Sequence, residues 1–361
     1  MVYKVIGIMS GSSVDGLDIA YVHLHETGGK WDYEILAAEC VEYTAEWKQQ
    51  LTNAIHLSGL EYQLLHTGYG HFIGEKINHF IIENGLQHKI DLVASHGHTT
   101  FHLPKQKMTA QIGDGAAIAA ETRLPVVSDL RSLDIAFGGQ GAPIVPIGQK
   151  LLFPEYHYFL NIGGIANVSV NNGGKYIAFD VCPANRVLNM FAEEMNMEHD
   201  ESGKIAASGK VNETLLQQLN ALPYYQQPFP KSLANSFGVD TVYPLIKKAG
   251  LTIPDALCTY VEHIALQIKK ALFTEITLSN VPLFVTGGGA LNTYLIERLK
   301  TILSEKGIEV VVPDERLVQY KEALVMALLG ALRWREEATV LSSVTGAAAN
   351  SVGGALWLGK L

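Results

Sequence analysis

The amino-acid sequence predicts an α/β protein of two domains that repeat one structural plan. Two apolar segments, residues 3–9 and 157–162, each lead into a glycine-containing turn, and a second apolar segment follows each turn. Segments whose apolar residues have helical spacing alternate with these strands, which is typical of α/β proteins. A chain of 361 residues is also too long for one small core. We therefore expect a duplicated α/β architecture.

The first half of the chain opens with a strand, a loop and a strand. Residues 3–9 and 19–25 are expected to be strands on either side of a loop rich in glycine and serine, and residues 31–43 to be a third strand. The second half repeats this order at residues 157–162 and 166–170.

The repeat in the second half is divided by a pair of glycines at 163–164. Residues 171–174 (Asn-Asn-Gly-Gly) then predict a hairpin turn that leads to a strand at residues 175–180.

Two helices are expected in the last third of the chain, with a strand and a triple-glycine turn between them at residues 282–292. Their apolar positions are Val261, Ile264, Ala265, Ile268 and Leu272, then Leu291, Leu295, Leu299 and Ile302. No charged or low-complexity linker marks a domain boundary. We expect one domain at residues 1–130, joined by residues 340–361, and the other at residues 131–339.

The composition excludes several classes of protein. No apolar window of about 18 residues lacks charges, and no signal peptide precedes the first strand, so we expect no membrane partner and a cytoplasmic location. The three cysteines include no CxxC pair, which argues against a disulfide framework or a cysteine zinc site. The net charge of −9 and the lack of a long basic run argue against nucleic acid. An anionic ligand would need backbone amides, a few basic residues or a divalent cation.

The first loop carries the strongest chemical signal. It contains the small or acidic residues Ser10, Gly11, Ser12, Ser13, Asp15, Gly16 and Asp18. Small residues let the backbone approach a phosphate, and a cation could lie between phosphate and carboxylates. A plain hairpin turn needs only one or two glycines, so phosphate or metal binding is the favoured interpretation.

Two further glycine turns follow strands. The pair Gly163 and Gly164 fits a structural turn and a second phosphate loop equally well. Three glycines at 287–289 cost backbone entropy, which a ligand pressed against the backbone would justify. Three such turns after three strands strengthen one another as evidence of ligand binding.

Other polar residues allow more than one interpretation. Asp180 ends a strand and is either a general base or, slightly favoured on position alone, a cap of the next turn. His96 and His98 are either a metal pair, groups that face a hydroxylated ligand, or buried structural histidines. Arg131 either binds a carboxylate or phosphate or pairs with Asp134 at the surface.

Three weaker signals remain. The glycine-dense segment 138–143 is expected to be a site loop. The pairs Lys231-Ser232 and Lys321-Glu322 are weak by themselves, and Cys182 is expected to be inert because no histidine is near it in sequence.

Together these segments resemble the anhydro-N-acetylmuramic acid kinase family. The similar segments run in family order over nearly the whole chain: residues 9–18, 95–99, 111–114, 138–146, 160–169, 207–209, 230–232, 287–292 and 344–346. The resemblance implies a duplicated actin-like (ribonuclease H-like) fold with an interdomain cleft, and a homodimer. It also implies that ATP, with Mg²⁺, and water convert 1,6-anhydro-N-acetylmuramic acid into N-acetylmuramic acid 6-phosphate during cell-wall recycling.

The resemblance also implies roles for individual residues. Asp180 occupies the position of the catalytic base, and His96, Arg131 and Glu322 are implied to bind the sugar. The first phosphate loop is Gly11, Ser12, Ser13, Val14, Asp15, Gly16, Leu17 and Asp18, with Asp15 implied to be a Mg²⁺ ligand. The other nucleotide contacts are Gly163 and Gly164, then Gly287, Gly288, Gly289 and Asn292 on the adenosine side.

The chain departs from the family pattern around Asp180. Where the family pattern has glycine, aspartate and arginine, this chain has Ala184, Asn189 and Asn235, respectively. Leu233 also differs from the pattern. The lost arginine removes a bidentate donor, and Ala184 adds a methyl group where a ligand could approach. Two alternatives therefore stay open: a kinase for a related amino sugar, and a non-catalytic nucleotide-binding module of the chaperone type.

Overall fold

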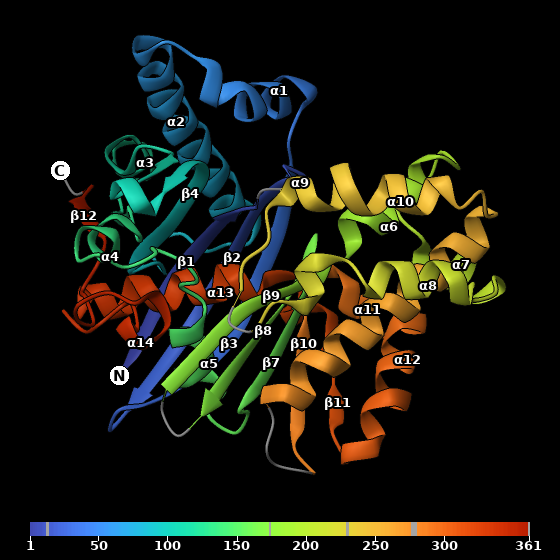
Figure 1. Cartoon of the computed structure of the whole chain (residues 1–361). Coiled ribbons are helices and arrows are strands. Elements are labelled where there is room, and N and C mark those ends of the chain that lie inside the picture. Colours follow the sequence, from blue (N-terminus) through green and yellow to red (C-terminus); the bar gives the residue numbers. More distant parts are fainter. Residues whose placement is uncertain (12–13, 173–174, 229–230, 276–279, 360–361) are drawn as a thin grey trace. The chain divides into compact units, whose positions relative to one another are not determined.

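The computed structural model describes the chain except residues 12–13, 173–174, 229–230, 276–279 and 360–361 (Figure 1). The chain divides into two compact units. Residues 1–154 and 320–361 form the first unit, and residues 155–319 form the second. The boundaries expected from the sequence were 130 and 340.

The first unit contains a mixed sheet and helices. Its strands are β1 (Val2–Ser10), β2 (Gly16–Thr27), β3 (Lys30–Glu42), β4 (Leu92–Leu103), β5 (Met108–Ile112), β6 (Pro125–Ser128) and β12 (Ala355–Leu358). Its helices are α1 (Ala45–Asn53), α2 (Gly59–Glu83), α3 (Gly115–Thr122), α4 (Ser132–Ala136), α5 (Pro146–Leu152), α14 (Ser342–Thr345) and most of α13 (Glu315–Trp334).

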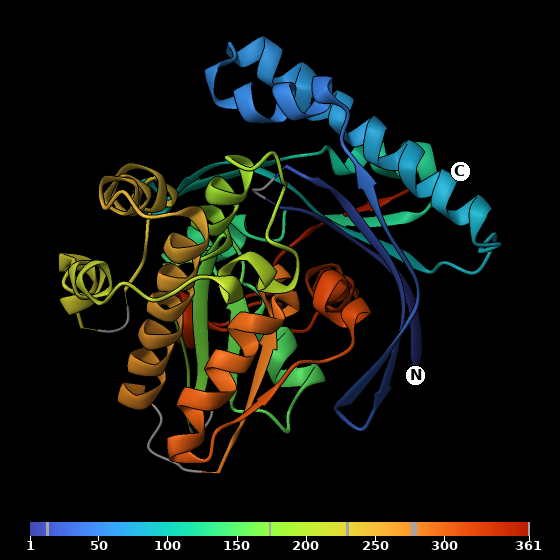
Figure 2. The same ribbon diagram turned by 90° about the vertical axis from the view of Figure 1, so that its right-hand side faces the viewer.

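The two faces of this sheet are covered by different helices, because alternate residues of a strand face opposite sides. Ile6 and Ile8 of β1 are fully buried in a core shared with α2. On the other face Gly7 lies against α13, where an added Cβ would be 1.9 Å from the Ala323 carbonyl oxygen. Gly330 makes a similar close contact with β4. Figure 2 shows α2 and α13 on opposite sides of the β1–β3 strands.

The second unit has its own sheet and core. Its strands are β7 (Tyr158–Ile162), β8 (Ile165–Asn172), β9 (Lys175–Pro183), β10 (Pro282–Thr286) and β11 (Glu309–Val311). Its helices are α6 (Asn185–Glu193), α7 (Lys204–Ser208), α8 (Glu213–Asn220), α9 (Asn235–Phe237), α10 (Tyr243–Lys248), α11 (Ile253–Glu275) and α12 (Thr293–Leu303). The apolar positions expected on α11 and α12 are buried in one cluster with β7, β8 and β10, except Leu291, which precedes α12 and is exposed.

Both sheets have the same strand order and directions. In the first unit the order β3–β2–β1–β4–β6 has antiparallel β1–β2 and β2–β3 pairs and parallel β1–β4 and β4–β6 pairs. In the second unit β9–β8–β7–β10–β11 has the same directions at each step. This confirms the expected duplicated α/β fold of ribonuclease H-like units.

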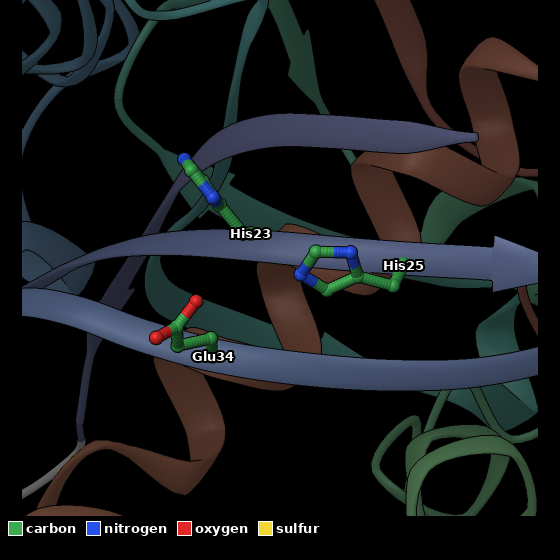
Figure 3. Close-up of side chains that lie close together, drawn as sticks. All are labelled: His23, His25 and Glu34. Atoms are coloured by element: carbon green, nitrogen blue, oxygen red, sulfur yellow. The ribbon is translucent and has the colours of Figure 1, made fainter.

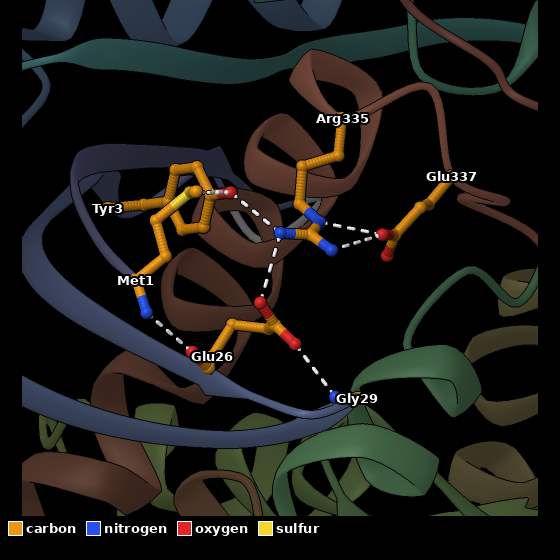
Figure 4. A network of polar contacts seen from close by, with 6 residues as sticks. All are labelled: Met1, Tyr3, Glu26, Gly29, Arg335 and Glu337. Carbon is orange, nitrogen blue, oxygen red and sulfur yellow. Dashed lines mark hydrogen bonds and ion pairs between the residues drawn. The ribbon is translucent and has the colours of Figure 1, made fainter.

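The first unit joins distant parts of the chain through Arg335, which follows α13 (Figure 4). Its guanidinium donates to the Glu337 carboxylate at 2.6 Å, the Tyr3 hydroxyl at 2.8 Å and the Glu26 carboxylate at 3.1 Å. The Met1 ammonium donates to the Glu26 carbonyl oxygen at 2.6 Å. These bonds hold the β1–β2 hairpin to the C-terminal part of the same unit.

Among the described residues, we find no helix that combines the length and apolar character needed to cross a membrane.

Candidate functional site

The turn between β1 and β2 is the first part of the candidate site. Ser12 and Ser13 lie outside the described residues. Val14 has a φ of 58°, which is rare for a β-branched residue, and its amide donates to the Gly11 carbonyl oxygen at 3.3 Å. A ligand-binding turn is a place where such a strained backbone is found.

The residues after this turn differ in what they can offer a ligand. Asp15 is exposed and Asp18 is partly exposed, whereas the Leu17 side chain is fully buried in the core. Gly16 is required by packing, because a Cβ there would be 2.6 Å from the Cys40 sulfur. The carboxylates are therefore the side chains of residues 14–18 best placed to meet a polar ligand.

Acidic groups meet near Asp18. The pKa of Asp18 is raised to about 6, mainly by burial and also by the negative charges of Glu322 and Asp15, while a hydrogen bond with Cys40 opposes the shift. Burial and the Asp18 charge raise the pKa of Cys40 to about 12. The field at Asp18 thus favours a proton or a cation.

Arg131 is held in a fixed orientation by His96. The Arg131 Nε donates to His96 Nε2 at 2.8 Å, and its Nη1 donates to the Gly141 carbonyl oxygen at 2.6 Å. Burial, followed by the nearby Arg131 charge, lowers the pKa of His96 to about 3. The neutral His96 accepts from Arg131 at Nε2, so its Nδ1–H donates to the Gly97 carbonyl oxygen at 2.9 Å.

Arg131 does not pair with Asp134. Asp134 is buried and accepts hydrogen bonds from the Gly141 amide and the Thr345 hydroxyl, both at 2.7 Å. Segment 138–143 thus wraps around Asp134 and provides the carbonyl that orients Arg131. Among the described residues the Arg131 Nη2 has no hydrogen-bond partner, which leaves donors for a carboxylate or phosphate.

His96 and His98 do not form a metal pair with a third ligand. His98 Nδ1 bonds the Ser10 hydroxyl at 3.0 Å, and the Tyr43 hydroxyl donates to the same Ser10 oxygen at 2.8 Å. Over the described residues, no potential third histidine, cysteine or carboxylate ligand joins these two histidines. Their observed roles are to support Arg131 and the end of β1.

In the second unit, Asp180 lies on β9 beside an irregularity in the β8–β9 pairing. Bulges of this kind often redirect a side chain near a site. Its Oδ2 accepts a hydrogen bond from the Leu233 amide at 2.9 Å and from the Ser232 hydroxyl at 3.2 Å. Position in the sequence alone favoured Asp180 as a cap of the next turn, but its partners are these two distant groups instead. Its Oδ1 has no hydrogen-bond partner among the described residues.

The surroundings of Asp180 tune its basicity. Burial raises its pKa above the usual value of 3.8, while the bonds from Leu233 and Ser232 lower it. The Tyr224 hydroxyl donates to the Asp180 carbonyl oxygen at 2.8 Å, and Lys231 lies 4.3 Å from the Tyr224 ring centroid. A partly buried carboxylate with one fixed oxygen is suited to take a proton from water.

Lys231 and Cys182 complete the surroundings of Asp180. Burial, then the positive charge of Lys270, lowers the pKa of Lys231 to about 8. Cys182 is fully buried, and burial raises the pKa of its thiol strongly. Cys182 therefore lacks the exposed thiolate that a nucleophile needs.

The glycines of the second unit divide into two groups. Gly287 has a φ of 83°, and a Cβ on Gly289 would be 2.2 Å from Ile162, so the fold itself requires these two. By contrast, a Cβ on Gly163, Gly164 or Gly288 would meet no chain atom closer than 3.6 Å, and none of the three has a left-handed φ. Packing and backbone conformation do not require glycine at these three positions, so the close approach of a ligand remains as a reason for it.

These glycine turns converge on the start of α6. The Asn185 amide donates to the Gly163 carbonyl oxygen at 3.1 Å, and the Ala184 amide donates to that of Gly164 at 2.8 Å. A Cβ on Gly288 would lie 3.6 Å from Asn185 Nδ2. The backbone of both turns therefore lies close to Asn185 in the second unit.

Asn292 acts as the N-cap of α12. Its side-chain oxygen accepts a hydrogen bond from the Leu295 amide at 3.0 Å, and asparagine is one of the residues preferred at N-caps. This cap leaves the side-chain amide nitrogen of Asn292 for an adenosine contact.

The departures from the family pattern leave the Asp180 contacts in place. Ala184 is fully buried, so its methyl group packs in the core rather than at an exposed surface. Leu233 serves Asp180 through its backbone amide, which any residue except proline offers. Asn189 lies on α6, and the side chain of Asn235 is outside the described set.

Several residues of the site were missed or underrated in the sequence. Tyr224 gave no signal, and Leu233 was noted only as a departure from the family pattern, because their contacts with Asp180 depend on the fold. Lys231 and Lys321 stood in pairs that were judged weak. Lys321 is buried, and burial lowers its pKa to about 8 while the Glu322 charge opposes the shift.

The family model and the related sequences agree on one family. Residues 3–359 match the family model described as anhydro-N-acetylmuramic acid kinase. Proteins of that name from Hydrogenovibrio crunogenus and Vibrio parahaemolyticus are 33% and 32% identical to this chain. The first match covers 98% of this chain and 97% of the relative, and the second covers 95% of each.

A solved structure, the activator of 2-hydroxyisocaproyl-CoA dehydratase from Clostridium difficile with bound ADPNP, has a TM-score of 0.47 and 16% identity. The alignment covers 91% of this chain and 94% of that one.

Proposed function

The chain belongs to the anhydro-N-acetylmuramic acid kinase family, and we propose that it converts 1,6-anhydro-N-acetylmuramic acid, ATP and water into N-acetylmuramic acid 6-phosphate and ADP. This reaction would return a cell-wall sugar to metabolism. The observation that carries the proposal is the Asp180 carboxylate, with Oδ2 fixed by two donors and Oδ1 without a partner in the described chain.

Asp180 is proposed as the general base. It takes a proton from a water molecule, whose oxygen bonds to the anomeric carbon as the bond from that carbon to O6 breaks. O6 then bonds to the γ-phosphorus of ATP as the bond to the β–γ bridging oxygen breaks, and ADP leaves. The raised pKa of Asp180 suits this role, because a stronger base removes a proton from water more readily.

The glycine turns are proposed to bind the nucleotide. Gly163, Gly164 and Gly288 leave room for phosphate or ribose against the backbone, which the packing of the chain does not fill. Residues 11–18 are proposed as the other phosphate loop, and Asn292 with residues 287–289 as the adenosine side.

Mg²⁺ is proposed to bind through Asp15, with Asp18 and Glu322 adding negative potential. Oxygen donors suit Mg²⁺, and the negative charges of Glu322 and Asp15, which contribute to the raised pKa of Asp18, support a cation here. Among the described residues, the carboxylates of Asp15, Asp18 and Glu322 do not form a cluster of three ligands. This arrangement suits an ion held by one or two carboxylates and by phosphates. When bound, Mg²⁺ would neutralise charge on the phosphates.

The sugar is proposed to contact Arg131, His96 and Glu322. The Arg131 guanidinium is oriented by His96 and Gly141, so its remaining donors can bind the lactyl carboxylate without a large ordering cost. The Glu322 carboxylate is proposed to accept from sugar hydroxyls.

We also propose that the protein works as a homodimer, as the family resemblance implies, and that it is located in the cytoplasm. Light scattering coupled to size-exclusion chromatography would measure the mass in solution, and a monomeric mass would overturn the dimer.

The test of the function compares Asp180→Asn with Asp240→Asn, an exposed carboxylate of the same unit. Asp180→Asn should keep ATP binding but lower kcat by at least about 100-fold, since general-base catalysis contributes roughly 10²–10⁴-fold. Asp240→Asn should match the unchanged protein. Equal turnover in all three proteins would remove Asp180 from this role.

A panel of amino sugars, with and without the 1,6-anhydro bridge, tests the substrate. The highest kcat/KM is expected for the anhydro-muramic sugar. A higher value for another amino sugar would support the related-sugar alternative, and ATP binding without turnover on any sugar would support the non-catalytic module.

A further inference from the structure

A cluster of two histidines and a glutamate lies on the β2–β3 hairpin of the first unit (Figure 3). His23 and His25 are two residues apart on β2, so they share a face of the sheet, and Glu34 of β3 is directly opposite His23. The cluster lies further along β2 than Asp18, toward the far end of the hairpin. It is therefore separate from the candidate catalytic residues and does not rest on their proposed roles.

A hydrogen bond at one ring nitrogen of His23 leaves the other nitrogen available to bind a ligand. His23 Nε2 bonds the Tyr21 hydroxyl at 2.8 Å, and that hydroxyl donates to the Lys89 carbonyl oxygen at 3.4 Å. Because the hydroxyl donates to Lys89, it accepts from His23, which places the proton on Nε2. Nδ1 then presents its lone pair, and metal-bound histidines commonly have an outer hydrogen bond of this kind.

The other two ligands are available as well. Within the described part of the chain, neither the His25 ring nor the Glu34 carboxylate has a hydrogen-bond partner. One ligand atom from each of the three residues lies within 4.8 Å of the others. Tetrahedral zinc bonds of about 2.0–2.1 Å would bring such atoms to roughly 3.4 Å, a closure that side-chain rotation can supply.

We propose that His23, His25 and Glu34 form a binding site for a divalent transition-metal ion of the zinc class. Two imidazole nitrogens and one carboxylate oxygen are a donor set that zinc prefers, whereas Mg²⁺ prefers oxygen donors alone. Three protein ligands leave a fourth position for water. The bound ion would hold β2 to β3 near the exposed end of the hairpin.

The test is titration calorimetry of the full chain with ZnCl₂ in excess MgCl₂, which saturates magnesium sites. His25→Gln should lower the zinc stoichiometry by one per chain relative to the unchanged protein. His79→Gln is the matched control, because His79 is an exposed histidine that pairs with a single carboxylate, Glu83. Equal stoichiometry in the unchanged protein and in His25→Gln would overturn the site.

A second variant separates metal binding from a folding defect. Tyr21→Phe keeps the buried ring but removes the hydroxyl that orients His23, so zinc affinity should fall by about 10–100-fold. Circular dichroism of each variant should match the unchanged protein. Co²⁺ should give a visible absorption band of low-coordinate cobalt that is absent in His25→Gln, and an identical band in that variant would contradict the assignment.

Discussion

Gly164 and Gly289 offer a way to separate a glycine needed by a ligand from a glycine needed by the fold. In Gly164→Ala the new methyl carbon would meet nothing closer than the Arg186 Cβ at 3.8 Å. In Gly289→Ala it would be 2.2 Å from a methyl carbon of Ile162, inside the core of the second unit. The same chemical change therefore meets open space at one position and a packed side chain at the other.

The expected magnitudes follow from these contacts. Gly164→Ala should leave stability unchanged or raise it by about 0.4–1 kcal/mol, because alanine restricts the unfolded chain. Gly289→Ala should lower stability by roughly 1–3 kcal/mol, the usual cost of overpacking. If Gly164 faces phosphate, the methyl group should raise the KM for ATP by about tenfold or more, since one hydrogen bond to a charged group is worth roughly 1.5–3 kcal/mol.

The assay combines urea unfolding with steady-state kinetics at varied ATP. The reasoning predicts that Gly164→Ala is stable but binds ATP poorly, and that Gly289→Ala is less stable. A Gly164→Ala protein with an unchanged KM for ATP would refute the proposed phosphate contact, and an equally stable Gly289→Ala would refute the packing argument.

Three further predictions concern single residues. Asn292→Ala should lower stability by about 0.5–2 kcal/mol by removing the α12 cap, whereas Asn292→Asp should keep it, and equal urea midpoints would contradict this role. Arg131→Lys should raise the sugar KM by about tenfold or more and leave the KM for ATP unchanged, because lysine lacks the planar fork; an unchanged sugar KM would argue against the contact. As pH falls through the raised pKa of Asp180, the base becomes protonated, so kcat/KM should decrease about tenfold per pH unit on a limb that begins above pH 3.8, and a profile flat to that pH would exclude this ionisation.

Much of the fold could be predicted because the signals were local. Apolar runs ended by glycine turns located β1, β2, β7 and β8, and helical spacing located parts of α11 and α12. The shared strand order of the two sheets depends on pairings between distant segments. The sequence indicated the repetition, but the order became visible only in the structure.

The site was less predictable, because its decisive contacts join residues far apart in the chain. The carboxylate of Asp180 is held by groups 52 and 53 residues away, and His96 orients an arginine 35 residues away. Three consecutive glycines at 287–289 look alike in sequence. Only their surroundings show that Gly287 and Gly289 serve the fold while Gly288 has open space.

The most direct test of the central claim is the mass of the sugar product formed with ATP, Mg²⁺ and 1,6-anhydro-N-acetylmuramic acid. Hydrolytic phosphorylation predicts a product heavier than the substrate by one water and one phosphoryl group, formed one-to-one with ADP and lost in Asp180→Asn. A product that gains only the phosphoryl group, or a failure to release ADP with this sugar, would contradict the account.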